Sequence, residues 1–71
     1  MSQLNISYSE RREVAWRRTG SGEIPYEAEV DGRRWTLRVN DFPAEPLYTL
    51  LVDGEPAGDL DAWPPAWRRP A

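Results

Sequence analysis

The chain has neither histidine nor cysteine among its 71 residues, and this removes most of the usual catalytic chemistry. Histidine is the commonest general base and metal ligand, and cysteine supplies thiolate nucleophiles, disulfides and thiolate metal sites. All nine basic residues are arginine, so no lysine can activate a hydroxyl group either. We therefore predict no catalytic residues, no cofactor and no enzyme activity.

Carboxylates are the acid and base groups that remain. Asp59 and Asp61 would share one face of a strand, and together with Asp53 and Glu55 they could offer oxygen ligands to a hard cation. Their spacing departs from the EF-hand loop, and a working carboxylate pair needs an enclosing cleft that so small a chain does not supply. We expect an acidic, solvated surface and no metal site, and an enzyme ranks third among the possible functions.

Arginine pairs next to aromatic residues raise the alternative of a domain that binds single-stranded nucleic acid. Arg17, Arg34 and Arg38 would be its basic residues, on one face of a small sheet with aromatic side chains. However, Glu27 and Glu29 share that face with Arg34 and Arg38, which indicates cross-strand ion pairs. The net charge of −3 also lacks the basic footprint of a phosphate-binding protein.

The alternation of apolar and polar residues predicts two strands and shows on which face of them these charges would lie. Residues 24–30 and 34–39 alternate apolar and polar side chains, and the dipeptide Asp31-Gly32 between them suits a two-residue type I′ turn. The hairpin then has one apolar and one charged face. Its predicted register pairs Val30 with Arg33, Glu29 with Arg34, Ala28 with Trp35, Glu27 with Thr36 and Tyr26 with Leu37.

A second hairpin is predicted from residues 48–52, the turn Asp53-Gly54 and residues 55–60. The strand at 47–52 is so apolar that we expect both of its faces to be covered. Two prolines make the preceding loop, residues 40–46, a stiff corner, and we expect Phe42 to be tucked into it.

The two ends of the chain are less clear. Residues 2–18 alternate like strands at Leu4, Ile6 and Tyr8, which we favour, but Ser7 and Glu10 have capping-box spacing for a helix over 8–18. The prolines of the run Trp63–Trp67 favour an extended, polyproline-like segment. This run either covers the second face of the sheet, which we favour, or serves as a ligand for an aromatic groove of another protein.

Together these patterns predict a mainly β fold. We expect one small domain over residues 1–71, an antiparallel meander of four to five strands that could curl into a barrel or sandwich. Residues 1–9 would be loosely ordered, a strand or a short helix, and residues 62–71 an extended C-terminal cover.

The function we predict is protein binding by a small accessory, inhibitor or immunity-type factor of a bacterial system. The partner would have a basic surface, attracted by the acids that follow Val39, and the chain would be a monomer or homodimer. No signal peptide or membrane span is apparent, so we expect a cytoplasmic protein without a membrane partner. The candidate partner-binding residues are Trp63, Trp67, Arg68, Tyr48, Asp59 and Asp61.

Overall fold

The two Asp-Gly dipeptides form the turns of two hairpins. In the computed structural model, which describes residues 6–70, Asp31 and Gly32 have φ angles of 54° and 78°, and Asp53 and Gly54 have 52° and 85°. Positive φ at both central residues is what a type I′ turn requires. The first hairpin has the predicted register, from Val30 opposite Arg33 to Tyr26 opposite Leu37.

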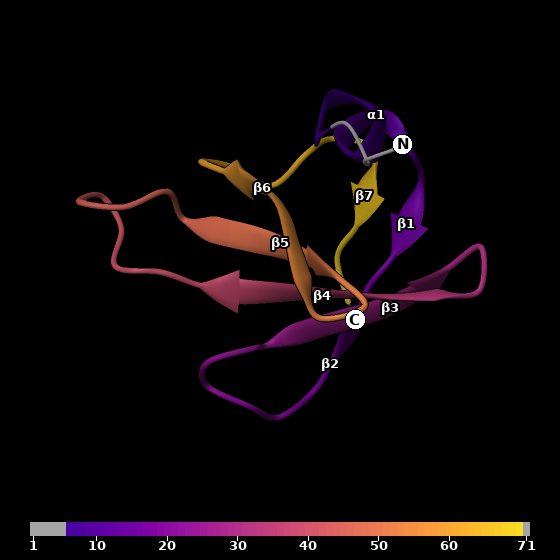
Figure 1. The fold of residues 1–71 in the computed structure, drawn as a ribbon, viewed down its shortest axis with the longest axis horizontal. Helices are drawn as coiled ribbons and strands as arrows, with labels where there is room; N and C mark the ends of the chain where they lie inside the picture. Colours follow the sequence, from indigo (N-terminus) through magenta and orange to yellow (C-terminus); the bar gives the residue numbers. More distant parts are fainter. Residues whose placement is uncertain (1–5, 71) are drawn as a thin grey trace.

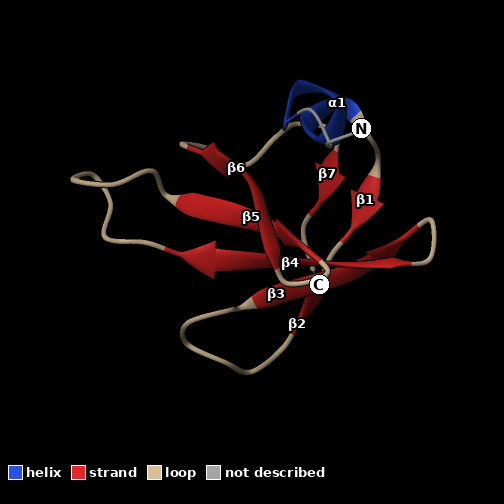
Figure 2. Ribbon diagram, viewed as in Figure 1, coloured by secondary structure: helices blue, strands red, loops and turns tan. Residues whose placement is uncertain are grey.

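These hairpins belong to a five-stranded antiparallel sheet whose strands follow the chain order β2-β3-β4-β5-β6 (Figures 1 and 2). A separate pair of short parallel strands, β1 and β7, joins the N-terminal and C-terminal parts of the chain. The elements are α1 (Ile6–Arg11), β1 (Val14–Ala15), β2 (Arg17–Arg18), β3 (Tyr26–Val30), β4 (Arg33–Val39), β5 (Tyr48–Val52), β6 (Glu55–Leu60) and β7 (Trp67–Arg68). The mainly β meander is confirmed, and it is not closed into a barrel.

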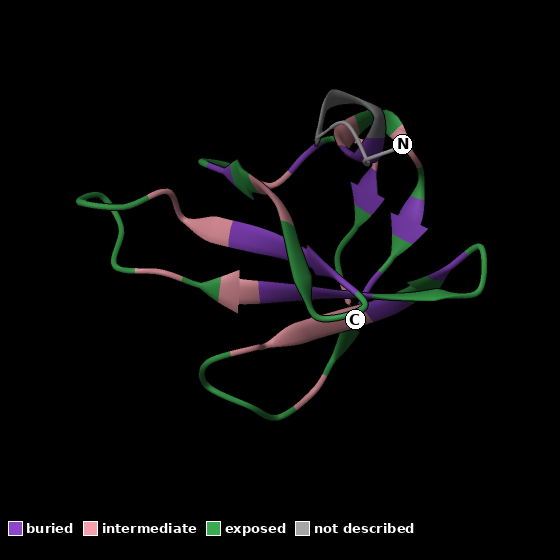
Figure 3. Ribbon diagram, in the orientation of Figure 1, coloured by how far each residue is buried: buried purple, intermediate pink, exposed green. Residues whose placement is uncertain are grey.

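The core lies on one face of this sheet, which we call the core face. Trp35, Leu37 and Leu50 are at most 2% exposed there. The segments that precede β2 and follow β6 cover this face, and Figure 3 shows the buried stretches of β1 and β7. The core cluster consists of Val14, Trp16, Ala28, Val30, Trp35, Leu37, Leu50, Val52, Leu60 and Trp67.

The C-terminal cover is confirmed by Trp67, which is 3% exposed and is the anchor of that segment. Its indole N–H donates a 2.8 Å hydrogen bond to the carbonyl of Ser9, so the cover also fixes the end of the chain that carries α1. A turn interrupts the segment, because the backbone N–H of Trp67 bonds to the carbonyl of Pro64. The run is therefore extended only in part.

The N-terminal segment combines both expected conformations. The helix covers Ile6–Arg11, and β1 and β2 follow it as two-residue strands. A strand through Ile6 and Tyr8 is therefore wrong, and so is a helix that continues to residue 18. The expectation for residues 1–5, including Leu4, lies outside the described residues.

The opposite face of the sheet, which we call the outer face, holds the charged residues. Glu27 lies opposite Arg17 on one side and Thr36 on the other, and Arg38 lies opposite Thr49. Leu51 also belongs to this face and is 8% exposed. No helix within residues 6–70 is long and apolar enough to cross a membrane.

Candidate protein-binding surface

Residues 40–47 form a loop that extends beyond the ends of β4 and β5 (Figure 1). We call it the β4–β5 loop. Backbone hydrogen bonds join Asn40 to Leu47 (3.0 Å) and Glu45 to Asp41 (2.8 Å). The Glu45 carboxylate also accepts the backbone N–H of Asp41 at 3.0 Å. The stiff corner predicted from the two prolines is thus held by bonds within the loop.

A chain of side-chain hydrogen bonds anchors the base of this loop to the outer face. The Asn40 amide nitrogen donates to the Pro46 carbonyl (3.0 Å) and to the Thr49 hydroxyl (2.8 Å). The Thr49 hydroxyl in turn donates to Asp59 at 2.8 Å, and Arg38 donates to the Asn40 side-chain oxygen at 3.3 Å. Three elements, β4, β5 and β6, therefore fix the position of the loop.

Phe42 is 51% exposed at this loop, and Val39 at its start is 37% exposed. Within the described part of the chain these are the two exposed large apolar side chains. The expectation that Phe42 is tucked into the corner is wrong. Because the loop extends past the strand ends, the cover of the core face does not reach it, and Phe42 has no second layer to pack under.

Acidic side chains flank the exposed ring. Asp41 and Glu45 are both exposed, and the sequence has no basic residue between Arg38 and Arg68. The surface around Phe42 thus combines one large apolar group with negative charge. Such a surface is complementary to an apolar pocket bordered by basic groups.

Of the C-terminal residues predicted to bind a partner, Trp67 belongs to the core and cannot present its ring to another protein. Trp63 is half-buried, and its indole N–H donates to the Trp67 carbonyl at 3.0 Å. Arg69 lies over the Trp63 ring at 5.0 Å, where a ligand cation would otherwise stack. Arg68 is exposed and forms an ion pair with Glu13 at 3.1 Å.

Tyr48 lies beside Trp63 at the margin of the core. Its ring meets those of Trp63 and Tyr26 edge to face, with centroids 6.3 and 6.2 Å apart. Burial raises the pKa of the Tyr48 hydroxyl above its ordinary value, and the neighbouring Tyr26 raises it further. Tyr48 therefore packs at the margin of the core. It does not belong to an open aromatic cage that could hold a ligand.

The acidic candidates are spread out. Asp59 accepts the Thr49 hydroxyl on the outer face, and Asp61 is exposed after the end of β6. Within residues 6–70 no group of three acidic side chains is arranged to hold a metal ion. The Thr49–Asp59 contact is a hydroxyl–carboxylate pair, but Thr49 is only 5% exposed and its oxygen also accepts the Asn40 amide.

The three arginines of the nucleic-acid alternative all lie on the outer face. Arg34 and Arg17 both approach the Glu27 carboxylate, at 2.8 and 3.8 Å, whereas Arg38 contacts Asn40. The four tryptophans, Tyr26 and Tyr48 pack in or against the core on the opposite face. The aromatic rings on which bases would stack are thus separated from the arginines.

Sequence reasoning did not predict that Phe42 is exposed. The two prolines and the flanking acids do indicate a stiff acidic loop, but they do not determine whether the ring points inward or outward. That direction depends on how far the cover extends over the sheet, which the loop sequence does not contain.

No protein-family model matches the chain, and neither a curated protein nor a solved structure matches it.

Proposed function

We propose that this chain is a small, non-catalytic protein-binding module whose contact surface is the β4–β5 loop. The observation that carries the proposal is the exposure of Phe42 on a loop held by hydrogen bonds at both its tip and its base. A preformed loop loses little conformational entropy on binding, so the burial of one aromatic ring contributes efficiently to affinity.

The partner in this proposal has an apolar pocket bordered by arginine or lysine. Asp41 directly precedes Phe42 in the sequence and Glu45 follows it by three residues; both are exposed, and the whole chain carries a net charge of −3. Opposite charges of this kind accelerate association, and their contribution decreases as salt is added. The apolar contact of Phe42 is far less sensitive to salt, so the two contributions can be separated by experiment.

The absence of catalysis is supported by the composition. The sequence contains no histidine, cysteine or lysine, and the Thr49 hydroxyl bonded to Asp59 is buried. A substrate could not reach that hydroxyl without the opening of the Asn40 contact. Single-stranded nucleic acid binding has weaker support, because Arg17 and Arg34 are paired with Glu27 and the tryptophans pack in or against the core on the opposite face.

A photo-crosslinking experiment tests the proposal. A benzophenone amino acid is placed at position 42, and at position 65 as a control, because Pro65 is also exposed but lies in the C-terminal cover. We expect crosslinks to one protein from position 42 in cells that naturally produce the chain, and none to that protein from position 65. Equal crosslinking from both positions would contradict the proposal.

The identified partner then allows an affinity measurement. We expect Phe42→Ala to weaken binding by about 30-fold or more, as for a central aromatic anchor, with Pro65→Ala unchanged. The double variant Asp41→Asn, Glu45→Gln should weaken binding at low salt and reduce its salt dependence. Unchanged affinity of a folded Phe42→Ala variant would rule out this loop as the anchor.

A further inference from the structure

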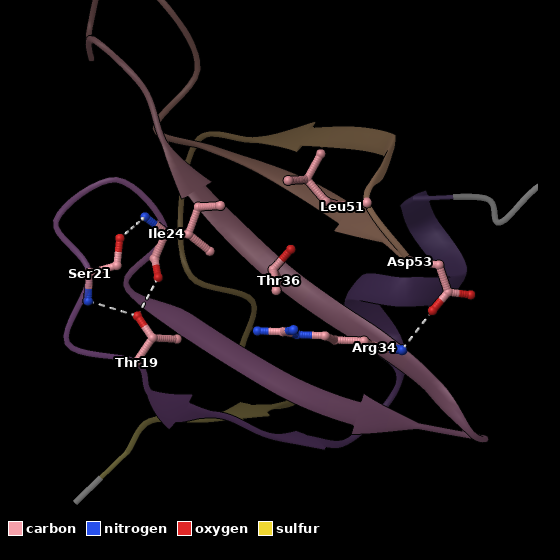
Figure 4. Close-up of a pocket in the computed structure, with 8 residues that line it drawn as sticks. Thr19, Ser21, Ile24, Arg34, Thr36, Leu51 and Asp53 are labelled. Atoms are coloured by element: carbon pink, nitrogen blue, oxygen red, sulfur yellow. Dashed lines mark hydrogen bonds between the residues drawn. The ribbon is translucent and has the colours of Figure 1, made fainter.

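A groove of about 780 Å³ lies on the outer face, apart from the β4–β5 loop. Thr36 and Leu51 form its floor, and Ser21 and Ile24 of the loop before β3 line one end (Figure 4). Asp53 lines the other end. This volume is within the range of roughly 300–1,000 Å³ that is usual for small-molecule sites.

The floor of the groove contains an unpartnered hydroxyl group. Thr36 is 8% exposed, and residues 6–70 provide no hydrogen-bond partner for its side chain. Thr49, on the same face and 5% exposed, has a hydroxyl that both accepts from Asn40 and donates to Asp59. The Thr36 hydroxyl is not among the buried unsatisfied groups of the described residues, so it is open to the groove and free to bond to a ligand there.

Two more donors face the same space. The Ser21 oxygen accepts the backbone N–H groups of Glu23 and Ile24, at 3.2 and 3.1 Å, so its own hydrogen remains available to donate. The Arg34 side chain extends along the sheet toward the loop that carries Thr19 and Ser21 (Figure 4). Only one of its terminal nitrogens is bonded to Glu27, which leaves further N–H groups for a ligand.

Two of the nearby carboxylates, those of Glu27 and Asp53, already have arginine partners. Glu27 is approached by Arg34 and Arg17, and Asp53 accepts the Arg34 backbone N–H at 2.9 Å with Arg33 at 3.8 Å. Glu29 lies opposite Arg34 on the same face, so three guanidinium groups stand near three carboxylates, and an anion would be held by the N–H groups of Arg34 that Glu27 does not accept. Asp53 lies at the end of the groove away from Ser21, whereas the Arg34 guanidinium points toward Ser21 (Figure 4).

Apolar side chains supply the rest of the surface. Leu51 is 8% exposed on the floor, and Ile24 is half-buried at the Ser21 end. Hydrogen-bond donors and positive charge therefore lie next to an aliphatic surface. This combination suits a ligand that joins an anionic acceptor group to an apolar group.

We propose that the groove binds a small carboxylate with an adjoining aliphatic group, which Arg34, Thr36 and Ser21 hold through hydrogen bonds while Ile24 and Leu51 contact the aliphatic part. Free organic acids and the C-terminal residue of a peptide share this chemistry. The site is separate from the β4–β5 loop, so it does not depend on the protein-binding proposal.

Amide-resolved NMR titration tests the site with three probes: N-acetyl-leucine, its uncharged amide N-acetyl-leucinamide, and a tetrapeptide that ends in leucine with a free carboxylate. We expect saturable shifts at Ser21, Arg34 and Thr36 with N-acetyl-leucine, and affinity at least about tenfold weaker for the amide. Tighter binding of the tetrapeptide would identify a peptide terminus as the source of the carboxylate, and tighter binding of N-acetyl-leucine a free acid.

Variants decide whether the proposed groups are responsible. Arg34→Gln should weaken N-acetyl-leucine binding by about tenfold or more, and Thr36→Val, which keeps the shape, by several-fold. Arg38→Gln is the matched control, because Arg38 is on the same face but does not line the groove, and it should bind normally. The proposal fails if the amide binds as well as the acid, if the shifts map elsewhere, or if no probe gives saturable shifts at millimolar concentration.

Discussion

The two faces of the five-stranded sheet differ in how their buried residues are covered. On the core face, aromatic rings pack on each other. The ring centroid of Trp16 lies 4.9 Å from that of Trp67 and 6.5 Å from that of Trp35. On the outer face, Thr49 is covered by a hydrogen-bonded network, and Thr36 lies beneath an open groove. The chain itself thus covers the buried residues of the core face, whereas on the outer face it covers Thr49 and leaves Thr36 open to the groove.

The difference shows that apolar burial outweighs hydrogen bonding on the core face. The indole N–H groups of Trp16 and Trp35 are buried without a partner among the described residues, at a cost of about 1–3 kcal/mol each. Burial of each ring contributes on the order of 4 kcal/mol or more at about 25 cal/mol per Å². A 71-residue chain can therefore tolerate these two groups in return for large rings in a thin core.

Removal of the Trp67 ring should have the largest effect, because it breaks the core face. We expect Trp67→Ala to lower the free energy of unfolding by about 3–5 kcal/mol, since it opens a cavity and removes the hydrogen bond to Ser9. That loss is comparable to the whole stability of many small domains. Urea unfolding followed by tryptophan fluorescence and circular dichroism measures it.

The neighbouring residue is the control for this variant. Arg68 is exposed and contributes an ion pair with Glu13, so Arg68→Ala should cost less than about 1 kcal/mol. A folded Trp67→Ala protein of nearly unchanged stability would show that the C-terminal cover does not complete the core.

Two variants of similar shape, Thr49→Val and Thr36→Val, compare the hydrogen-bonded and the open part of the outer face. Thr49→Val leaves the Asn40 amide and Asp59 without their shared partner, and we expect a loss of about 1–2 kcal/mol in the free energy of unfolding. Thr36→Val removes a hydroxyl that has no partner, so the change should be near zero or slightly stabilising. The measurement is urea unfolding of both variants in parallel, without added ligand.

The sign of the difference is the decisive result. If Thr36→Val destabilised the chain as much as Thr49→Val, the Thr36 hydroxyl would have an intramolecular partner in solution. The groove would then lose its argument for a ligand, while the network at the base of the β4–β5 loop would be unaffected.

The sequence was sufficient for the core face and insufficient for the outer face. Asp31-Gly32 determines a turn with positive φ at two residues, and strand alternation then allows only one register that buries Trp35. Both signals are local, so the first hairpin could be predicted pair by pair. The C-terminal cover was also predicted, but the sequence left Trp67 as a candidate partner-binding residue, and the structure places its ring in the core.

The exposed sites depend on contacts between distant parts of the chain. The groove over Thr36 exists because the loop before β3 lies at the edge of the outer face, and Phe42 is exposed because the cover ends before reaching the β4–β5 loop. Neither the position of the loop before β3 nor the extent of the cover can be read from a short pattern of residues. The N-terminal segment was ambiguous for the same reason, since the buried Ser9 accepts a hydrogen bond from Trp67, which lies 58 residues further along the chain.

The smallest predicted effect is at Tyr48, where the core face meets the solvent. Its pKa is raised above the ordinary tyrosine value of about 10, mainly by burial, so at high pH the unfolded chain releases this proton before the folded chain does. The unfolded state then binds fewer protons, and stability must fall as the pH rises above about 10. We expect Tyr48→Phe to make that fall shallower, and Arg69→Gln to make it steeper, because Arg69 lowers the Tyr48 pKa. Urea unfolding at a series of pH values from neutral to alkaline gives both slopes, and equal slopes in all three proteins would show that the Tyr48 hydroxyl is as solvated in the folded chain as in the unfolded one.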